Sequence, residues 1–142
     1  MARLSPQVAS EANELRLVLG QLVRRLRAEY ASPVAHASVL SRLDRDGAQT
    51  TSALAAAERV RPQSMAQTLA ELEGEGLVSR RADPGDRRQT LLELTESGQR
   101  RVREERGRRA SWLAEAISAE LAPEERKVLF AAVPLLRRLA EH

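Results

Sequence analysis

The chain has 142 residues, enough for one domain or for one domain with a dimerising extension. It contains 23 basic and 20 acidic residues, so its net charge is +3, and all but one of the basic residues are arginines. There is no cysteine, which excludes disulfides, thiol sensors and cysteine-bound zinc or iron–sulfur sites. Two histidines and three aromatic residues also argue against a histidine-rich metal site and a base-stacking platform.

The chain shows no apolar run that approaches the roughly 18 residues of a membrane span. Charged residues interrupt its first 19 residues, which therefore lack the order of a secretory signal. We expect a soluble cytoplasmic protein without membrane contact, and we expect no metal and no cofactor.

Arginines gather in residues 80–109, where ten arginines and six acidic residues give a net charge of +4. The rest of the chain therefore has a net charge of −1. A basic patch on a nearly neutral protein fits a polyanionic partner that binds at one surface. A solvated arginine-rich face would look the same, so charge alone leaves both interpretations open.

Helix-start signals and apolar spacing predict two helices in the first third of the chain. Ser5-Pro6 and Ser32-Pro33 each combine an N-cap residue with proline at the first helical position. Between Ala12 and Leu26, apolar residues recur every three or four positions, which predicts a helix of about six turns. A second apolar stripe starts at Val34, and Asp46-Gly47 ends that helix.

The middle of the chain predicts a helix-turn-helix followed by a hairpin. Thr50 or Thr51 can cap a short third helix, and Pro62 opens a fourth helix that Gly74 and Gly76 close. Residues 77–81 and 89–94 are short and strand-like. The run Asp-Pro-Gly-Asp at 83–86 is a strong turn signal between them, so we predict a hairpin with a charged tip.

The helical pattern returns after Thr95 and continues to about residue 121. Val102 is the only sizeable apolar residue in 99–109, and such a polar stretch usually bridges packed units. Its arginines continue the basic excess of the wing, and we expect them to lie near phosphates. Pro123 opens a last helix, which Pro134 should kink or shorten.

These elements predict a fold class that is mostly α with a small two-stranded β-hairpin wing. It is a winged helix-turn-helix with long terminal helices, whose surplus apolar stripes suggest that two chains pack together. We expect dimerisation helices in residues 1–31 and 110–142 and the DNA-binding unit in residues 32–98. Residues 99–109 would form the polar part of the connecting helix.

The fourth helix has a polar face that could read double-stranded DNA. On a helical wheel, Met65, Leu69 and Leu72 share the buried side, and Gln63 and Gln67 lie opposite, near the helix N-terminus. That end of a recognition helix meets base edges, and glutamine can bond adenine bidentately. Ser64 and the first-turn amides suit a phosphate. An ordinary solvent-exposed helix face remains the alternative.

The hairpin tip carries Arg87 and Arg88. An arginine on a narrow loop can enter the minor groove, where a narrow A·T groove concentrates negative potential. Asp86 beside them could orient a guanidinium. A plain surface turn is the alternative, but a recognition helix next to an arginine-rich hairpin is suited to meet adjacent grooves.

The motifs of residues 50–98 together resemble the MarR-type transcriptional regulators. The wing run Ala82-Asp83-Pro84-Gly85-Asp86-Arg87-Arg88 and the later Leu94-Thr95-Glu96-Ser97-Gly98 resemble that family's wing signature. Leu54-Ala55, Val60–Met65 and the stretch from Leu69 to Val78 resemble its helix-turn-helix. In length and element order, the resemblance covers the whole chain.

The resemblance implies a homodimer that binds pseudo-palindromic DNA, often as a repressor released by a small aromatic or anionic effector. It implies that Arg88 reaches the minor groove and that Asp86 supports the wing. The recognition-helix contacts would be Gln63, Ser64, Gln67 and Thr68; with Arg61 and Arg87 they complete our candidate set. Gln67 stands where many members have arginine, which puts the base preference in doubt, and the lack of cysteine excludes thiol oxidation as a signal.

Two other functions remain as alternatives. Glu71, Glu73 and Glu75 on the fourth helix would repel phosphate if they approached it, which favours a winged-helix adaptor that binds protein and not DNA. An enzyme is disfavoured, because no nucleophile–base pair, metal-ligand cluster or glycine-rich phosphate loop is visible. The cleft between the terminal helices and the winged-helix unit is the effector site that the resemblance implies, with Arg16, Tyr30, His36 and Trp112 as candidates.

Overall fold

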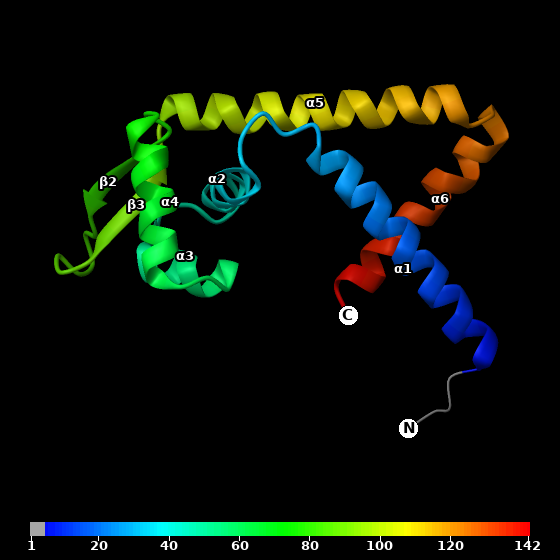
Figure 1. Cartoon of the computed structure of the whole chain (residues 1–142), viewed down its shortest axis with the longest axis horizontal. Helices are drawn as coiled ribbons and strands as arrows, with labels where there is room; N and C mark the ends of the chain where they lie inside the picture. The colour runs from blue at the N-terminus through cyan, green and yellow to red at the C-terminus, as the bar shows by residue number, and fades with distance from the viewer. Residues whose placement is uncertain (1–4) are drawn as a thin grey trace.

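The computed structural model describes residues 5–142 and contains six helices and three strands. Figure 1 shows the longest helix, α5, along one edge, with the helix-turn-helix and hairpin at its N-terminal end and α1 and α6 beside its C-terminal half. Residues 1–4 of the predicted segment 1–31 lie outside the described residues. The elements are α1 (Pro6–Arg27), α2 (Val34–Asp46), β1 (Gln49–Thr50), α3 (Thr51–Glu58), α4 (Pro62–Gly74), β2 (Val78–Ala82), β3 (Thr90–Leu94), α5 (Glu96–Glu120) and α6 (Pro123–Ala140).

Local capping chemistry sets the starts of α1 and α3 where the sequence predicts them. The predicted start of α2 is wrong by one residue, because Pro33 and not Ser32 is its N-cap residue, and the Ser32 hydroxyl instead accepts a hydrogen bond from Arg101. Ser5 Oγ accepts the Val8 N–H, and Thr50 Oγ1 accepts the Ala53 N–H at 3.1 Å. Each of these bonds satisfies a backbone donor that has no partner inside the helix. Pro134 shifts no boundary, because α6 continues through it to Ala140.

The sheet has one strand more than predicted. The hairpin of β2 and β3 is present, with Arg80 opposite Leu92 in the antiparallel register. The short strand β1 pairs with the other edge of β3, with Gln49 opposite Leu92, so the strand order is β1-β3-β2. Two residues are too few for an alternation pattern, and their partner is far along the chain, which explains why the sequence does not predict β1.

One hydrophobic core joins the helix-turn-helix to the hairpin. Met65, Leu69 and Leu72 are buried, which confirms the predicted inner side of α4. Val102 of α5 closes the same core. The core residues are Val39, Leu40, Leu43, Leu54, Ala55, Met65, Leu69, Leu72, Leu77, Val78, Leu92 and Val102.

The helices α1 and α6 differ from this unit, because neither contains a buried residue in the single chain. Their apolar side chains line an open groove with α5, formed by Leu22, Trp112, Phe130 and their neighbours. No helix of residues 5–142 is long and apolar enough to cross a membrane.

The polar stretch 99–109 lies where α5 leaves the winged-helix unit, and part of its charge is used inside the chain. Arg101 donates to Ser32 Oγ at 2.8 Å, Arg106 pairs with Asp44 at 2.8 Å, and Arg109 donates to the Tyr30 hydroxyl. These three side chains are therefore bound inside the chain, because α2 and the α1–α2 connection pack against this face of α5. The proximity of this stretch to phosphates stays a prediction.

Candidate nucleic-acid interface

The fourth helix, α4, presents the predicted polar face to solvent. Gln63, Ser64 and Gln67 are exposed, and Thr68 is half-buried at the edge of the core. Arg61 is exposed at the N-cap position with extended backbone (φ −68°, ψ 146°), so its side chain leaves the chain just before the first helical turn. Because Met65, Leu69 and Leu72 on the opposite side of α4 are packed in the core, this polar face points to solvent.

A tight turn joins α3 to α4. Arg59 adopts a left-handed conformation (φ 55°) as the C-cap of α3, and the Val60 N–H donates to the Ala55 carbonyl oxygen at 3.0 Å. Leu54 and Ala55 of α3 share the core with the inner side of α4. The two helices are therefore held as one helix-turn-helix with α4 as its second helix.

The wing tip is ordered by its two aspartates. Asp83 Oδ1 accepts the Gly85 N–H at 2.8 Å, and Asp86 Oδ1 accepts the Arg88 N–H at 3.1 Å. The Arg88 guanidinium lies 3.9 Å from Asp86, and its side chain is 96% exposed. A turn closed by side-chain oxygens thus presents a highly exposed arginine at the end of the hairpin.

The Leu-Thr-x-x-Gly motif, Leu94 to Gly98, lies at the base of the wing, and its contacts there show why these residues are needed. Thr95 Oγ1 donates to the Gly76 carbonyl oxygen at 2.6 Å and accepts the Gly98 N–H at 3.1 Å, so one hydroxyl caps α5 and ties it to the end of α4. A Cβ atom at Gly98 would lie 2.1 Å from the Leu77 carbonyl oxygen. The glycine is needed because α5 and β2 approach each other at this point.

The acidic residues of α4 all have cationic or imidazole partners within the chain. Glu73 pairs with Arg80 of β2 at 2.7 Å, and Glu75 lies 3.8 Å from Arg101 of α5. Glu71 bonds His36 of α2. These contacts weaken the argument that the three glutamates favour a protein-binding adaptor, because their charges are drawn toward the body of the molecule.

His36 lies inside the winged-helix unit, between two of these carboxylates. It is 6% exposed, and its Nε2 lies 2.5 Å from Glu71 Oε2. Its Nδ1 has no hydrogen-bond partner and lies 3.7 Å from Glu75 Oε1. The hydrogen bond from His36 holds the pKa of Glu71 below its usual range. These contacts join α2 to the end of α4, and a contact of His36 with an effector stays a prediction.

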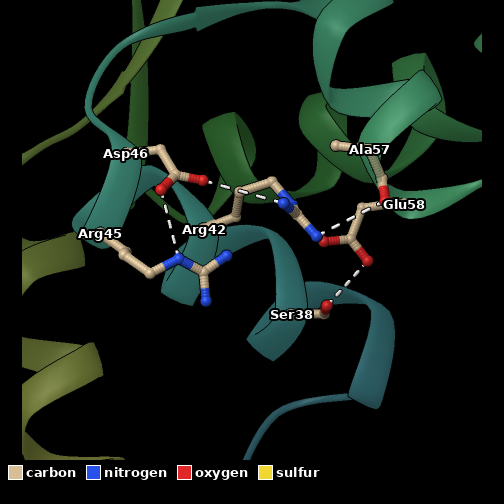
Figure 2. Close-up of polar contacts among 6 residues, drawn as sticks. All are labelled: Ser38, Arg42, Arg45, Asp46, Ala57 and Glu58. Atoms are coloured by element: carbon tan, nitrogen blue, oxygen red, sulfur yellow. Dashed lines mark hydrogen bonds and ion pairs between the residues drawn. The ribbon is translucent and has the colours of Figure 1, made fainter. Parts of the chain in front are cut away.

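A second polar cluster fastens α3 to α2 (Figure 2). Glu58, at the end of α3, accepts hydrogen bonds from Ser38 Oγ and Arg42 Nε, both at 2.8 Å. Burial raises the pKa of Glu58, but these bonds and the charges of Arg42 and Arg45 outweigh it, so the pKa is lowered. Asp46 extends the cluster through contacts with both arginines.

The four effector candidates do not converge on one site in the described part of the chain. Tyr30 lines a hollow at the corner of α1 and α2, and Trp112 lies in the apolar groove of α1, α5 and α6 with Arg25 over its ring. Arg16 is exposed on α1 and bonds Asn13, while His36 is buried as described. Tyr30 is itself covered by the Arg109 guanidinium.

The helix-turn-helix, the capped hairpin and the contact of α5 with both define a winged-helix protein. The sequence profile of the MarR family matches residues 34–90. An HTH-type transcriptional regulator of Mycobacterium tuberculosis is 41% identical over 133 residues, which are 92% of each chain. The chain belongs to the MarR family.

Solved structures agree with this assignment. A Pseudomonas aeruginosa protein described as a transcriptional regulator is 40% identical, with a TM-score of 0.86 over 98% of this chain and 99% of that one. An S. aureus MepR mutant bound to an oligodeoxyribonucleotide has the same fold (19% identity, TM-score 0.68, 92% of this chain and 96% of that one). The chain is a transcriptional regulator of the MarR family, and we set the enzyme alternative aside.

Proposed function

We propose that this regulator binds double-stranded DNA sequence-specifically, with α4 in the major groove and the hairpin tip in the adjacent minor groove. The observation that carries the proposal is the pairing of two features in one unit. These are a polar face with Gln63 and Gln67 at the N-terminal half of α4, and the exposed Arg88 on an ordered wing tip. In Figure 1 the N-terminal end of α4 and the tip of the hairpin lie at the end of the unit away from α5. Such a role places the protein in the cytoplasm.

The proposed contacts divide between bases and backbone. Gln63 and Gln67 offer amides to base edges, and Arg88 offers a guanidinium to the minor groove. Arg61 and Ser64 lie at the helix start, where a cation, a hydroxyl and free amides suit phosphates. Thr68, one turn further along α4 from Ser64, offers a second hydroxyl. Arg87 adds positive charge beside Arg88, and Asp86 supports the wing turn through the Arg88 N–H.

The active species in this proposal is a homodimer that binds a pseudo-palindromic site. The support is the apolar groove of α1, α5 and α6, which is uncovered in the single chain. Leu22, Phe130 and Val133, which line this groove, are exposed to solvent. A second copy would bury these faces and place two α4 helices for two half-sites.

We further propose that the regulator is a repressor that a small aromatic or anionic effector releases from DNA. Two hollows adjoin at the corner of α1 and α2, and both are lined by Arg27, Val34, Ser38 and Glu58. The second hollow also reaches Ser64 and Thr68 of α4. A ligand there would touch residues that we propose contact DNA. Adding phenolic carboxylates to the preformed complex should release labelled DNA; a complex that no such compound weakens would contradict this part.

The central test is selection of bound duplexes from random DNA, followed by titration of the selected sequence with two variants. Arg88→Ala should weaken binding by about 1–3 kcal/mol, or roughly 5- to 150-fold, because it removes a groove contact. Arg138→Ala removes the same charge from an exposed position on α6, which lies apart from α4 and the hairpin in Figure 1, and should change the affinity little. Failure to select any sequence, or equal effects of both variants, would contradict the proposal.

A further inference from the structure

A chain of side chains runs from the surface of α4 into the body of the molecule. Gln67 Nε2 donates to Glu71 Oε1 at 3.4 Å, one helical turn further along α4. The other carboxylate oxygen of Glu71 lies 2.5 Å from His36 Nε2. Gln67 is exposed, Glu71 is half-exposed, and His36 is buried. The glutamine at the proposed interface is therefore connected to a residue fixed inside α2.

The contact with Glu71 determines which way the Gln67 amide points. A glutamine amide has an oxygen that accepts and a nitrogen that donates, and the two ends are almost equal in size. An ionised carboxylate only accepts hydrogen bonds, so the nitrogen end must face Glu71. The carbonyl oxygen and the second N–H of Gln67 then have one defined order along the outer face of α4.

The carboxylate is in turn held in place by His36. The short contact requires a proton on Nε2, because that nitrogen must donate to the Glu71 oxygen. His36 is packed in α2, the helix that carries core residues Val39 and Leu40, so its ring cannot follow a moving surface side chain. The hydrogen bond also favours the ionised form of Glu71, as the lowered pKa indicates.

We propose that His36 and Glu71 are positioning residues that set the amide orientation of Gln67 and thereby the base that Gln67 reads. The inference rests on the proposed function, because it assumes that Gln67 faces a base edge. Adenine presents an acceptor at N7 and a donor at N6, and a glutamine amide matches both only in one orientation. A free amide could turn over and meet the reversed order of another base pair. The anchored amide selects one base pair.

Glu71→Gln is the informative variant, because it keeps the shape of the side chain and removes the acceptor-only partner. Glu73→Gln is its matched control, since it removes the same charge from the same helix, where Glu73 is bound to Arg80. Binding to the selected duplex is compared with binding to a set of duplexes that each carry one base-pair change within a half-site.

The wild type should discriminate at one base pair by about tenfold or more, and Gln67→Ala should abolish that discrimination. Glu71→Gln should reduce it at the same base pair and no other, whereas Glu73→Gln should retain it. In the Gln67→Ala background, Glu71→Gln should have no further effect on base preference. A merely structural role for Glu71 would instead weaken all duplexes alike.

A second pair of variants tests the His36 link. His36→Gln can place a donor near the position of Nε2 and should retain most of the discrimination, while His36→Leu lacks a donor and should lose it. Two results would overturn the inference. One is an unchanged base preference in Glu71→Gln. The other is that both His36 variants lose the discrimination and bind every duplex more weakly by the same factor. Discrimination that survives in Gln67→Ala would also overturn the inference, but it would not contradict the proposal that the protein binds DNA. If no duplex is selected at all, the proposed function fails first.

Discussion

The winged-helix unit and the terminal helices carry similar apolar stripes but bury them differently. Twelve residues from α2–α4, the hairpin and the start of α5 form one core. By contrast, 13 of the 15 large hydrophobic residues that are exposed among the described residues lie on α1 and α6. Apolar spacing therefore shows which face of a helix is expected to be buried. It does not show whether that face packs against the same chain or against another one.

This contrast has a consequence for how each region is stabilised. The winged-helix unit holds its fold through its own core, two polar clusters and the cap at Thr95. The terminal helices, in our proposal, depend on a second copy of the chain. Stability measurements that separate the two regions test this difference directly.

The largest expected effect is the truncation of a core leucine. Leu69 is 0% exposed, so Leu69→Ala should lower the free energy of unfolding by about 2–5 kcal/mol, because it leaves a cavity. Leu22→Ala in α1, where the leucine is 42% exposed, should cost far less in dilute protein. Urea unfolding measures both. Equal costs at every protein concentration would show that α1 belongs to the core of the same chain.

A smaller effect is expected where α5 approaches β2. Gly98→Ala should destabilise by about 1–3 kcal/mol, because the added methyl group would overlap the Leu77 carbonyl oxygen. Gly107→Ala is the control in the same helix, since a Cβ there meets nothing within 4 Å. It should stabilise by up to about 1 kcal/mol through helix propensity. Thermal unfolding of the two variants should therefore shift in opposite directions.

Dilution should affect the terminal helices alone. If a second copy covers α1 and α6, each tenfold dilution of a dissociating dimer lowers their stability by up to about 1.4 kcal/mol. Hydrogen exchange at two concentrations should show faster exchange in α1 and α6 after dilution and unchanged exchange in α2–α4. Identical exchange in a sample that light scattering shows to be monomeric would contradict the proposed dimer interface.

The smallest effect concerns the cluster that joins α3 to α2. Glu58→Gln should cost about 1 kcal/mol at neutral pH, because it weakens bonds from Ser38 and Arg42 to a charged acceptor. The pKa of Glu58 is lowered in the folded state, so its contribution is complete above its ordinary pKa of about 4.3. It is lost as the pH falls through the lower folded pKa. The difference between the wild type and the variant, measured by urea unfolding, should therefore shrink on acidification.

Much of the winged-helix unit could be predicted because its signals are local. The caps at Thr50 and Thr95 act on amides three residues away, and Pro62 and the wing turn act within a few residues. The inner side of α4 follows from helical spacing, and the outer side, with Gln63 and Gln67, follows with it. The candidate interface was found for this reason, although its contacts with DNA stay a prediction.

Other features depend on residues that are distant in sequence. His36 and Glu71 are 35 positions apart, so no spacing rule shows that they bond. Glu105 lies on a stretch that reads as polar, but it is 3% exposed, because α5 packs against α2 there. Strand β1 has too few residues to show a pattern.

The sequence by itself determined the order of the helices and of the two hairpin strands, the caps at Ser5, Thr50 and Thr95, the polar face of α4 and the charged wing tip. These depend on backbone hydrogen bonds and side-chain periodicity over one or two helical turns. Only the tertiary structure decided which charges of α4 and α5 are paired, which polar residues are buried, and which apolar faces remain uncovered. Those outcomes depend on which elements pack together, and packing joins residues whose separation along the chain carries no local signal.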